Sequence, residues 1–547
     1  MALPVGAAEP GVTRGRRTRP HRLAYSSQQK TISLFAEMRH SDRMTQASSA
    51  QPNWSVTNQA AALVPAAVTA LLDREWRLLI DGTLVSATGH RTYQRVSPYG
   101  EMVIAEAPDA DVGDVDTAAR TAHAARAKWR ATPNTERAEL VRALADSIEE
   151  HGEELALLDT VDAGSPISNS RADVATAVMQ LRMFAGQALE LKGTSVPASH
   201  GLHITVREPV GVVARIVPYN HPLMFACKIG APLVAGNPTI LKPPEAAPLS
   251  ALRLGELAAD IFPPGVLSVV VGDGPAIGDA LVRHRQVRRI GFIGSEPTGR
   301  AIQRAAAETA VKDVTLELGG KNAMVVFADA DLDAAAKGAV FGMNFTWSGQ
   351  SCGSNSRLLV QREVHDVLVE KVVALIERRR IGDPFDEATE QGTMINRAQY
   401  EKTLRYIETA KSEGATVVTG GGPPSNLERG LFVAPTVFTG VRPDSRIAQE
   451  EVFGPLLSVL SFTDEDEAIA IANDVDYGLT ASVWTQDVAR AHRMVHEFEA
   501  GFTWINDSSR HFPNVPFGGV KGSGVGREES LEELLSYTEL KTINVNY

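Results

Sequence analysis

The sequence has little cysteine, no apolar run long enough to cross a bilayer and no true G-x-G-x-x-G fingerprint. Cys227 and Cys352 are its only cysteines, which excludes a disulfide framework and fits a reducing, cytoplasmic compartment. No Cys/His cluster has the spacing of metal ligands, so no metal site is expected. The net charge of −12 argues against a nucleic-acid surface. We therefore expect a globular protein without a membrane or nucleic-acid partner.

Residues 1–73 differ in composition from the rest of the chain. Five arginines crowd a start that has almost no acidic residues: Arg14, Arg16, Arg17, Arg19 and Arg22. An organellar transit peptide has this composition, and so has a disordered tail or an upstream extension of a protein that begins at Met44. We favour a disordered extension over 1–73.

The chain is too long for one compact core, so two or more domains are expected. Strand and helix patterns alternate from 211 to 318 and again from 319 to about 520, which predicts parallel sheets covered by helices. Strands are predicted at 212–217, 239–242, 266–271, 289–293, 314–316, 323–327, 357–361, 415–419, 456–462, 481–484 and 502–505. Helices are predicted at 115–130, 135–158, 171–191, 223–234, 247–261, 275–282 and 297–310. The fold class is α/β, with two doubly wound domains that bind ligands at the carboxyl ends of their strands.

Two glycine-bearing loops carry the chemistry. Residues 315–322 (TLELGGKN) place the Glu317 carboxylate beside two glycines, and residues 349–354 (GQSCGS) hold the Cys352 thiol. A thiolate attacks carbonyl carbon, and a nearby carboxylate takes a proton from the thiol or from water. A predicted strand and then a helix at 329–347 separate the loops. The acid and the thiol are therefore expected to return to one cleft, although either residue alone is more often structural.

These two stretches resemble the active-site signatures of the aldehyde dehydrogenase superfamily, in the family's order and approximate spacing. The resemblance covers roughly 76–547. It implies an aldehyde dehydrogenase-like fold that oxidises an aldehyde to the carboxylic acid with NAD, through a thiohemiacetal and a thioester on Cys352. Asn220, in the loop 217–222 (VPYNHP), would hold the oxyanion together with the Cys352 amide, and Glu317 would activate the hydrolytic water.

The expected cofactor residues follow the predicted strands. Lys242 and Glu245 follow one of them, and a carboxylate there binds both ribose hydroxyls and repels a 2′-phosphate, which favours NAD over NADP. Residues 292–299 (FIGSEPTG) end a strand and begin a helix whose free amides suit a pyrophosphate. By resemblance, Glu451 would bind the nicotinamide ribose and Phe453 would back the ring. The full expected set is Ile216, Val217, Pro218, Tyr219, Lys242, Pro244, Glu245, Gly274, Gly278, Phe292, Gly294, Ser295, Thr298, Leu318, Gly319, Gln399, Lys402, Glu451 and Phe453.

The substrate pocket is expected to be mostly apolar or aromatic, and the natural aldehyde is left open. Its expected lining is Phe345, Trp347, His511 and Phe517. Two alternatives remain, a coenzyme A-acylating enzyme and a non-catalytic member of the same fold. Glu317 favours hydrolysis, because family branches that transfer the acyl group to coenzyme A generally lack this base.

The resemblance also implies a domain plan. It assigns an NAD-binding domain to 74–192 and 210–318, a catalytic domain to 319–532, and a β-strand oligomerisation arm to 193–209 and 533–547. Strand patterns at 201–208 and 540–547 supply the arm, since an exposed strand edge is a natural pairing site. A homodimer or homotetramer is expected.

Overall fold

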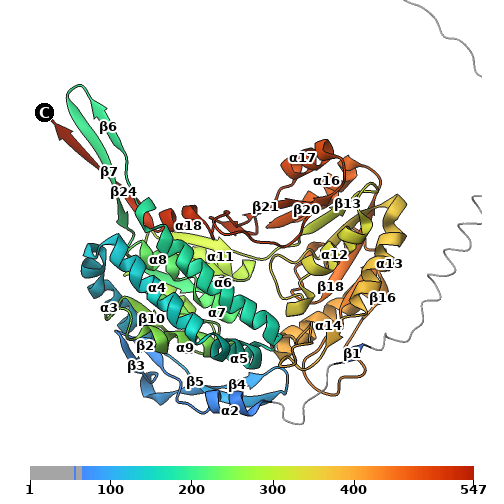
Figure 1. The fold of residues 1–547 in the computed structure, drawn as a ribbon, viewed down its shortest axis with the longest axis horizontal. Coiled ribbons are helices and arrows are strands. Elements are labelled where there is room, and N and C mark those ends of the chain that lie inside the picture. The colour runs from blue at the N-terminus through green and yellow to red at the C-terminus, as the bar shows by residue number, and fades with distance from the viewer. Residues whose placement is uncertain (1–53, 57–63) are drawn as a thin grey trace, which may run out of the picture. The chain divides into compact units, whose positions relative to one another are not determined.

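The computed structural model describes residues 54–56 and 64–547, which lie in one compact unit. Two large sheets and a projecting arm organise this part of the chain (Figure 1). The helices span Ala66–Leu72 (α2), Val112–Ala131 (α3), Asn134–Glu150 (α4), Gly152–Ala163 (α5), Ile167–Gly186 (α6), Pro222–Ala226 (α7), Gly230–Val234 (α8), Leu249–Ala258 (α9), Ala276–Arg283 (α10), Glu296–Thr309 (α11), Leu332–Gly342 (α12), His365–Ile376 (α13), Arg397–Ser412 (α14), Arg446–Gln449 (α15), Glu465–Asn473 (α16), Val488–Glu497 (α17) and Leu531–Ser536 (α18).

The first large sheet has eight strands. In spatial order they are Gly524–Val525 (β23), Asp313–Glu317 (β12), Val287–Ile293 (β11), Val212–Ile216 (β8), Thr239–Lys242 (β9), Leu267–Val269 (β10), Leu78–Ile80 (β2) and Thr83–Val85 (β3). The strands from β12 to β10 are parallel, and the outer strands pair antiparallel. The chain order reverses between β8 and β11, and ligands of such sheets bind beyond the carboxyl ends of the strands at that reversal. The loops after β8 and β11 therefore mark a ligand site.

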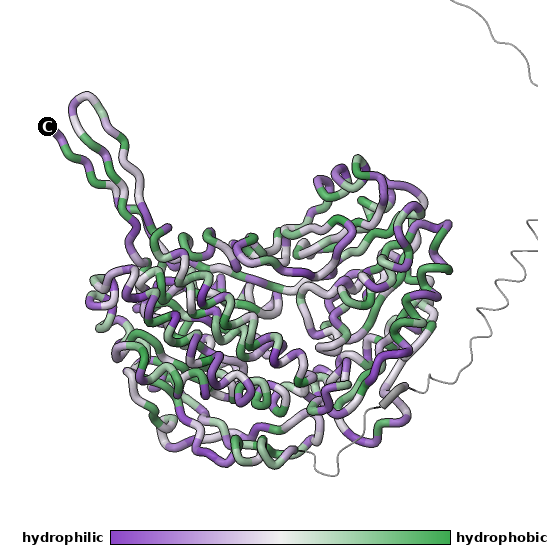
Figure 2. Tube along the Cα trace, in the orientation of Figure 1, coloured by the Kyte–Doolittle hydropathy of each residue, from purple (hydrophilic) through white to green (hydrophobic). Residues whose placement is uncertain are grey.

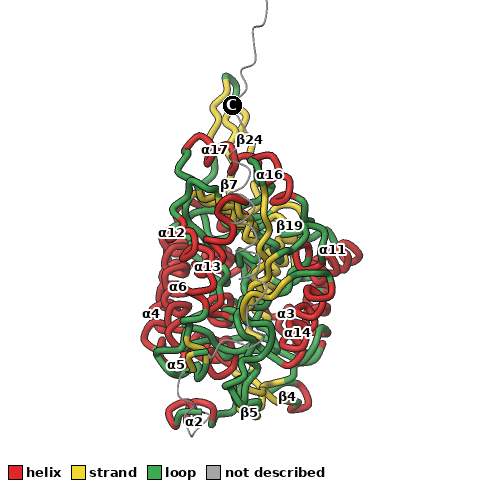
Figure 3. The backbone as a smooth tube through the Cα atoms, turned by 90° about the vertical axis from the view of Figure 1, so that its right-hand side faces the viewer, coloured by secondary structure: helices red, strands yellow, loops and turns green. Residues whose placement is uncertain are grey.

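The second large sheet has seven strands. In spatial order they are Thr416–Thr419 (β16), Thr436–Thr439 (β17), Leu456–Phe462 (β18), Arg357–Gln361 (β14), Ala323–Val326 (β13), Thr480–Trp484 (β20) and Phe502–Ile505 (β21). Successive residues of β13 face opposite sides, so Ala323 and Val325 join one hydrophobic core while Met324 and Val326 join the other. Seen from the side, the strands run between helices on both faces (Figure 3). Burial on both faces explains why the central strand β13 is wholly apolar.

The arm is a three-stranded antiparallel sheet in the order Thr538–Asn546 (β24), Gly201–Pro209 (β7) and Ser195–Ala198 (β6). Apolar residues are interspersed among polar ones along β24 (Figure 2). Leu540, Ile543 and Val545 on this strand are exposed. The outer edge of β24 has no neighbouring strand among the described residues.

The carboxyl-terminal region contributes to the first sheet before it reaches the arm. Strand β23 pairs with β12, although it lies within the range 319–532 expected for the catalytic domain. Within 533–547, the range expected for the arm, Leu534 and Tyr537 are instead buried in the core of the first sheet. The arm strand itself begins at Thr538.

Residues 54–56 and 66–72 correct the expectation of a disordered extension over 1–73. Trp54 is buried in a core of the second sheet, and Ser55–Val56 (β1) pairs with Arg380–Ile381 (β15). Residues 66–72 form α2, which buries Val68. Burial of these apolar side chains offsets the cost of ordering the segment. The arginine-rich start and Met44 lie outside the described residues.

Three predicted helices end earlier than the sequence pattern suggests. The helix predicted at 135–158 is interrupted at His151, which has φ −97° and ψ 18°. The helix predicted at 223–234 is divided into α7 and α8. The helix predicted at 329–347 is capped at Asp331 and followed by Asn344 in the left-handed region, with φ 54°. In each case the hydrophobic spacing continues through a turn, so the pattern does not reveal the break.

Two further observations concern the described residues only. None of their helices is both long enough and apolar enough to span a membrane. No group of three or more of their His, Cys, Asp and Glu side chains is placed to hold a metal ion.

Candidate active site

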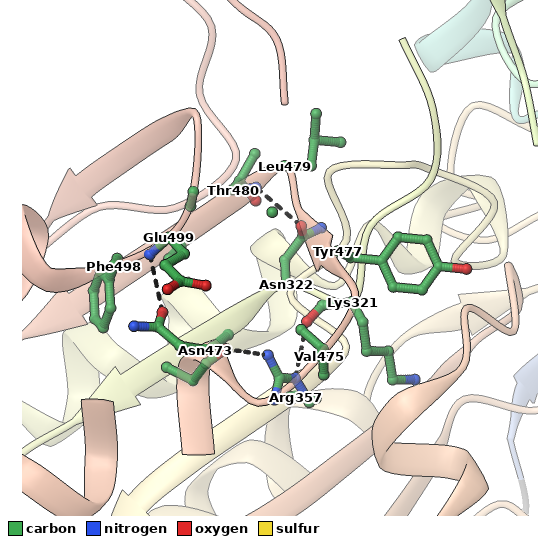
Figure 4. Close-up of a pocket in the computed structure, with 15 residues that line it drawn as sticks. Lys321, Asn322, Arg357, Asn473, Val475, Tyr477, Leu479, Thr480, Phe498 and Glu499 are labelled. Carbon is green, nitrogen blue, oxygen red and sulfur yellow. Dashed lines mark hydrogen bonds between the residues drawn. The ribbon is translucent and has the colours of Figure 1, made fainter. Parts of the chain in front are cut away.

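The loop that carries Cys352 is tied to the second sheet by one asparagine. The Asn322 side-chain amide donates to the carbonyl oxygens of Cys352, at 2.7 Å, and of Ser354, at 3.0 Å. Its Oδ1 accepts from the backbone amide of Thr480 at 3.0 Å, as Figure 4 shows. A single side chain thereby fixes the cysteine loop against β13 and β20.

Cys352 is a thiol rather than a thiolate at neutral pH. Burial raises its pKa to about 12, and the carboxylates of Glu451, Glu317 and Glu529 add to this effect. Nucleophilic attack by this sulfur therefore needs a base that takes the thiol proton.

Glu317 ends β12 and is buried. Neither of its carboxylate oxygens has a hydrogen-bond partner among the described residues. Burial and then Glu528 raise its pKa well above the ordinary value, against the opposing effect of Lys228. Gly518, with φ +156°, leaves room for this carboxylate, because a Cβ there would lie 2.6 Å from Glu317 Oε1. A carboxyl group with a raised pKa is suited to general acid–base chemistry.

Asn220 lies in the loop after β8, at the reversal in strand order. Its Oδ1 has no partner among the described residues. Asn220, Glu317 and Cys352 together line both a cavity of about 230 Å³ and an adjoining cavity of about 210 Å³. Amide, carboxyl and thiol, which are distant along the chain, therefore share one site at the junction of two cavities.

The first cavity gathers most of the expected cofactor residues. Its expected lining residues are Pro218, Tyr219, Gly294, Ser295, Leu318, Gly319, Gln399, Lys402, Glu451 and Phe453. The rings of Tyr219 and Phe453 meet edge to face, with centroids 6.0 Å apart. Phe225 and Ile293 also line this cavity and were not expected there. We call it the cofactor-side cavity.

The Glu451 side chain lies beside Gly319 and Gly320 and is fixed by a hydrogen bond. Its Oε1 accepts from the Gly320 amide at 3.1 Å, and its own carbonyl accepts from Lys402 Nζ at 3.5 Å. Burial raises the pKa of Glu451 to about 7, against the effect of the Gly320 amide. Gly319 is required beside it, because a Cβ at that position would lie 2.1 Å from Glu451 Oε2. Gln399 Nε2 donates to the carbonyl oxygens of Val452 and Phe453, which positions the Phe453 ring.

The remaining expected cofactor residues lie outside the lining of this cavity: Ile216, Val217, Lys242, Pro244, Glu245, Gly274, Gly278, Phe292 and Thr298. Lys242, at the end of β9, donates to Glu245 at 2.8 Å. Although burial raises the pKa of Glu245, the Lys242 charge and hydrogen bond leave it below the ordinary value. Thr298 bonds Ser295 through their hydroxyl groups at 3.0 Å, so Ser295 begins α11 without a side-chain cap bond. These groups follow β9 and β11, at the same edge of the first sheet.

The second cavity contains Trp347, His511 and Phe517 from the expected substrate pocket. We call it the acyl-side cavity. Phe345 was expected here but is buried in a core of the second sheet. It begins the single 3₁₀ turn Phe345–Trp347, which places its ring in the core while Trp347 lines the cavity.

Polar side chains also line the acyl-side cavity. Its further lining residues are Thr176, Gln180, His221, Met224, Phe225, Lys228, Ile293, Asn344, Ser351, Gly353, Ser509, Glu528 and Glu529. Four of them have the spacing i, i+3, i+4 and i+7, namely His221, Met224, Phe225 and Lys228. This helical spacing could have identified them from the sequence. Gln180 and the two glutamates come from distant segments and carry no comparable signal.

This chain resembles known proteins in both sequence and structure. Residues 84–543 match the model of the "Aldehyde dehydrogenase family". The chain is 44% identical over 480 residues to the aldehyde dehydrogenase tropH of Talaromyces stipitatus, covering 86% of this chain and 93% of that protein. A putative aldehyde dehydrogenase from Burkholderia cenocepacia has a similar structure, with TM-score 0.84 and 43% identity over 86% of this chain and 97% of that one. The betaine aldehyde dehydrogenase of Staphylococcus aureus in complex with NAD⁺ also has a similar structure, with TM-score 0.86 and 36% identity over 88% of this chain and 97% of that one.

Proposed function

The chain belongs to the aldehyde dehydrogenase family and oxidises an aldehyde to the carboxylic acid, and we propose that Cys352, Glu317 and Asn220 carry out this reaction with NAD as cofactor. The roles are assigned to these residues because of where they lie. These three residues line both cavities, so a carbonyl carbon at Cys352 has room for a cofactor on one side and for the rest of the substrate on the other.

The residues divide the chemistry as follows. Glu317 takes the proton of the Cys352 thiol, which burial otherwise keeps protonated. The thiolate attacks the aldehyde carbon to give a thiohemiacetal, whose oxyanion accepts hydrogen bonds from the Asn220 side-chain amide and the Cys352 backbone amide. Glu317 then passes the thiol proton to solvent. After oxidation to the thioester, its free carboxylate takes a proton from water, and the hydroxide attacks the thioester carbon, which releases the acid and the Cys352 thiolate.

The residues around the cofactor-side cavity fit NAD, whose nicotinamide supplies a hydride acceptor when it is bound. Tyr219 and Phe453 give aromatic surface, and Glu451 offers a carboxylate next to them. The amides at the start of α11 suit a pyrophosphate. Glu245, paired with Lys242, would hold the adenosine ribose through its hydroxyls and disfavour a 2′-phosphate.

Replacement of Cys352 by alanine tests the role of the thiol. We expect Cys352→Ala to lose NADH formation with every aldehyde while it retains NAD binding, measured by cofactor fluorescence. Cys227→Ala is the matched control, since Cys227 is the other cysteine, is buried in the core and lines neither cavity. Turnover by Cys352→Ala at the wild-type rate would remove this residue from the mechanism.

A product assay with coenzyme A tests hydrolysis against acyl transfer. Glu317 at the wall of both cavities supports hydrolysis, so the free acid should form at the same rate with or without coenzyme A. Accumulation of an acyl-coenzyme A would identify the enzyme as acylating instead.

We also propose the assembly and the domain plan. The exposed apolar residues of β24 support a homodimer or homotetramer that pairs through this edge. The cofactor domain would comprise 74–192 and 210–318, completed by β23, and the catalytic domain would start at 319. Two cysteines without a disulfide support a cytoplasmic location.

A further inference from the structure

Two histidines of the acyl-side cavity are held by carboxylates in the same way. His221 Nδ1 lies 2.8 Å from Asp173 Oδ2, and His511 Nδ1 lies 2.9 Å from Glu529 Oε2. Because a carboxylate only accepts hydrogen bonds, Nδ1 of each ring carries the proton. In the neutral imidazole, Nε2 is then an acceptor. Neither Nε2 atom has a hydrogen-bond partner within residues 54–56 and 64–547.

Gln180 adds a third acceptor to the same cavity. Its Nε2 donates to Glu529 Oε1 at 3.5 Å, an orientation that follows from the carboxylate's need for a donor. Its Oε1 is buried and has no hydrogen-bond partner among the described residues. Gln180 is 6% exposed, so this orphaned oxygen costs free energy unless a donor reaches it.

Apart from Glu317, the cations and carboxylates that line this part of the cavity are already paired with one another. Lys228 Nζ lies 3.0 Å from Glu529 and 3.5 Å from Glu528, and Glu528 also accepts from Arg215 at 2.8 Å. Two cations thus balance two carboxylates. A substrate carboxylate would meet Glu528 and Glu529, and a substrate ammonium would meet Lys228, so neither charge is favoured.

Aromatic side chains provide the apolar part of the wall. Trp347 packs on His221 with centroids 4.8 Å apart, and Phe225 meets the same ring edge on at 5.4 Å. Phe517 packs on His511 at 4.4 Å. Such surfaces suit a flat, conjugated substrate.

We propose that the acyl-side cavity selects aromatic aldehydes that bear hydroxyl groups, with His511, His221 and Gln180 as the acceptors for those hydroxyls. This inference rests on the proposed function of Cys352 and its neighbours. The three residues position the substrate and take no part in bond making. A phenolic hydroxyl is neutral, donates one hydrogen bond and lies on an aromatic ring, and it therefore meets each property of this wall.

The test compares pairs of substrates that differ in one donor. The values of kcat/KM with NAD are compared between 3- and 4-hydroxybenzaldehyde and their partners 3- and 4-methoxybenzaldehyde. Benzaldehyde, 4-carboxybenzaldehyde and an amino-aldehyde complete the panel. We expect the wild-type enzyme to prefer one hydroxy compound over its methoxy partner by about tenfold, the equivalent of about 1.4 kcal/mol. His511→Phe and Gln180→Leu should each lower that ratio about threefold to tenfold. His511→Gln, which restores an acceptor, should recover part of the ratio.

His365→Phe is the matched control, because His365 Nδ1 also lies 2.8 Å from a carboxylate, that of Asp366, and lines neither cavity. Its hydroxy-to-methoxy ratio should equal that of the wild type. A wild-type ratio near one, an unchanged ratio in both His511→Phe and Gln180→Leu, or a preference for the carboxylate or amino-aldehyde would overturn this inference alone. Absence of turnover with every aldehyde, benzaldehyde included, would overturn the proposed function as well.

Discussion

Glu317 is a residue at which stability and activity depend on pH in opposite directions. Burial raises its pKa above that of an ordinary glutamate. The folded state therefore binds this proton more tightly than the unfolded state does. Its contribution to stability is fully present below the unfolded pKa and is lost as pH rises through the folded pKa. The base form needed for catalysis appears over that same interval.

Glu317→Gln tests both effects. Without the buried charge, the free energy of unfolding should exceed that of the wild type at pH 9 and show a smaller excess at pH 5, in denaturant titrations. The kcat should fall by about 10²- to 10⁴-fold and lose its acid limb, because thiol deprotonation and thioester hydrolysis both need this base, and any thioester that forms on Cys352 should persist in mass spectra. Exposed Glu363→Gln should leave these quantities unchanged. Wild-type turnover by Glu317→Gln would place the base elsewhere.

Gly319 makes a different demand, since it leaves space for the Glu451 carboxylate. A Cβ at Gly319 would lie 2.1 Å from Glu451 Oε2, so a methyl group there would displace this carboxylate. Gly319→Ala should therefore raise KM for NAD about tenfold to a hundredfold, as expected for a lost charge-assisted hydrogen bond. Alkylation of Cys352 by iodoacetamide should continue. Gly186→Ala, where a Cβ meets nothing within 4 Å, is the control, and an equal KM in the two variants would contradict the proposed role of Glu451.

At the scale of elements, residues 54–56 are held by the pairing of β1 with β15 and by the burial of Trp54 in a core of the second sheet. The Trp54 side chain is buried, and its carbonyl accepts from the Asn426 side chain at 2.6 Å. This short element joins segments that are far apart in the sequence, because β1 pairs with β15.

Trp54→Ala should lower the free energy of unfolding by about 3–5 kcal/mol, because it removes a large buried side chain. Urea titrations followed by circular dichroism would measure this loss, with the exposed Phe341→Ala as control. A change below about 0.5 kcal/mol would show that 54–56 is not part of the stabilising core.

At the scale of the whole molecule, the arm presents a strand edge with exposed apolar residues. Ile543→Asp should shift the mass measured by light scattering towards that of a single chain, since it puts a charge in place of an exposed apolar side chain that the assembly would bury. Asn544→Asp places the same charge on the neighbouring position and the other face, and should preserve the assembly. A wild-type protein that is monomeric at micromolar concentration would contradict the proposed assembly.

The sequence by itself determined the family and the α/β class, and it predicted which groups react. The prediction of an aldehyde dehydrogenase-like α/β fold is confirmed by the family match and by the TM-scores of 0.84 and 0.86. Local signals were sufficient for this, because the loops around Glu317 and Cys352 combine a reactive side chain with glycines at fixed spacing. Strand β9 and strand β14 were likewise predicted to the residue, since each is a short apolar run between turns.

Only the tertiary structure decided what surrounds those groups. The burial that raises the pKa of Cys352, the addition of β23 to the first sheet and the clustering of Gln180, His511 and Glu529 arise from segments hundreds of residues apart. Phe345 lies in the core, one turn away from the cavity wall that its neighbour Trp347 reaches. Periodicity describes how side chains point along one element, whereas the electrostatics and shape of a cavity depend on which elements meet.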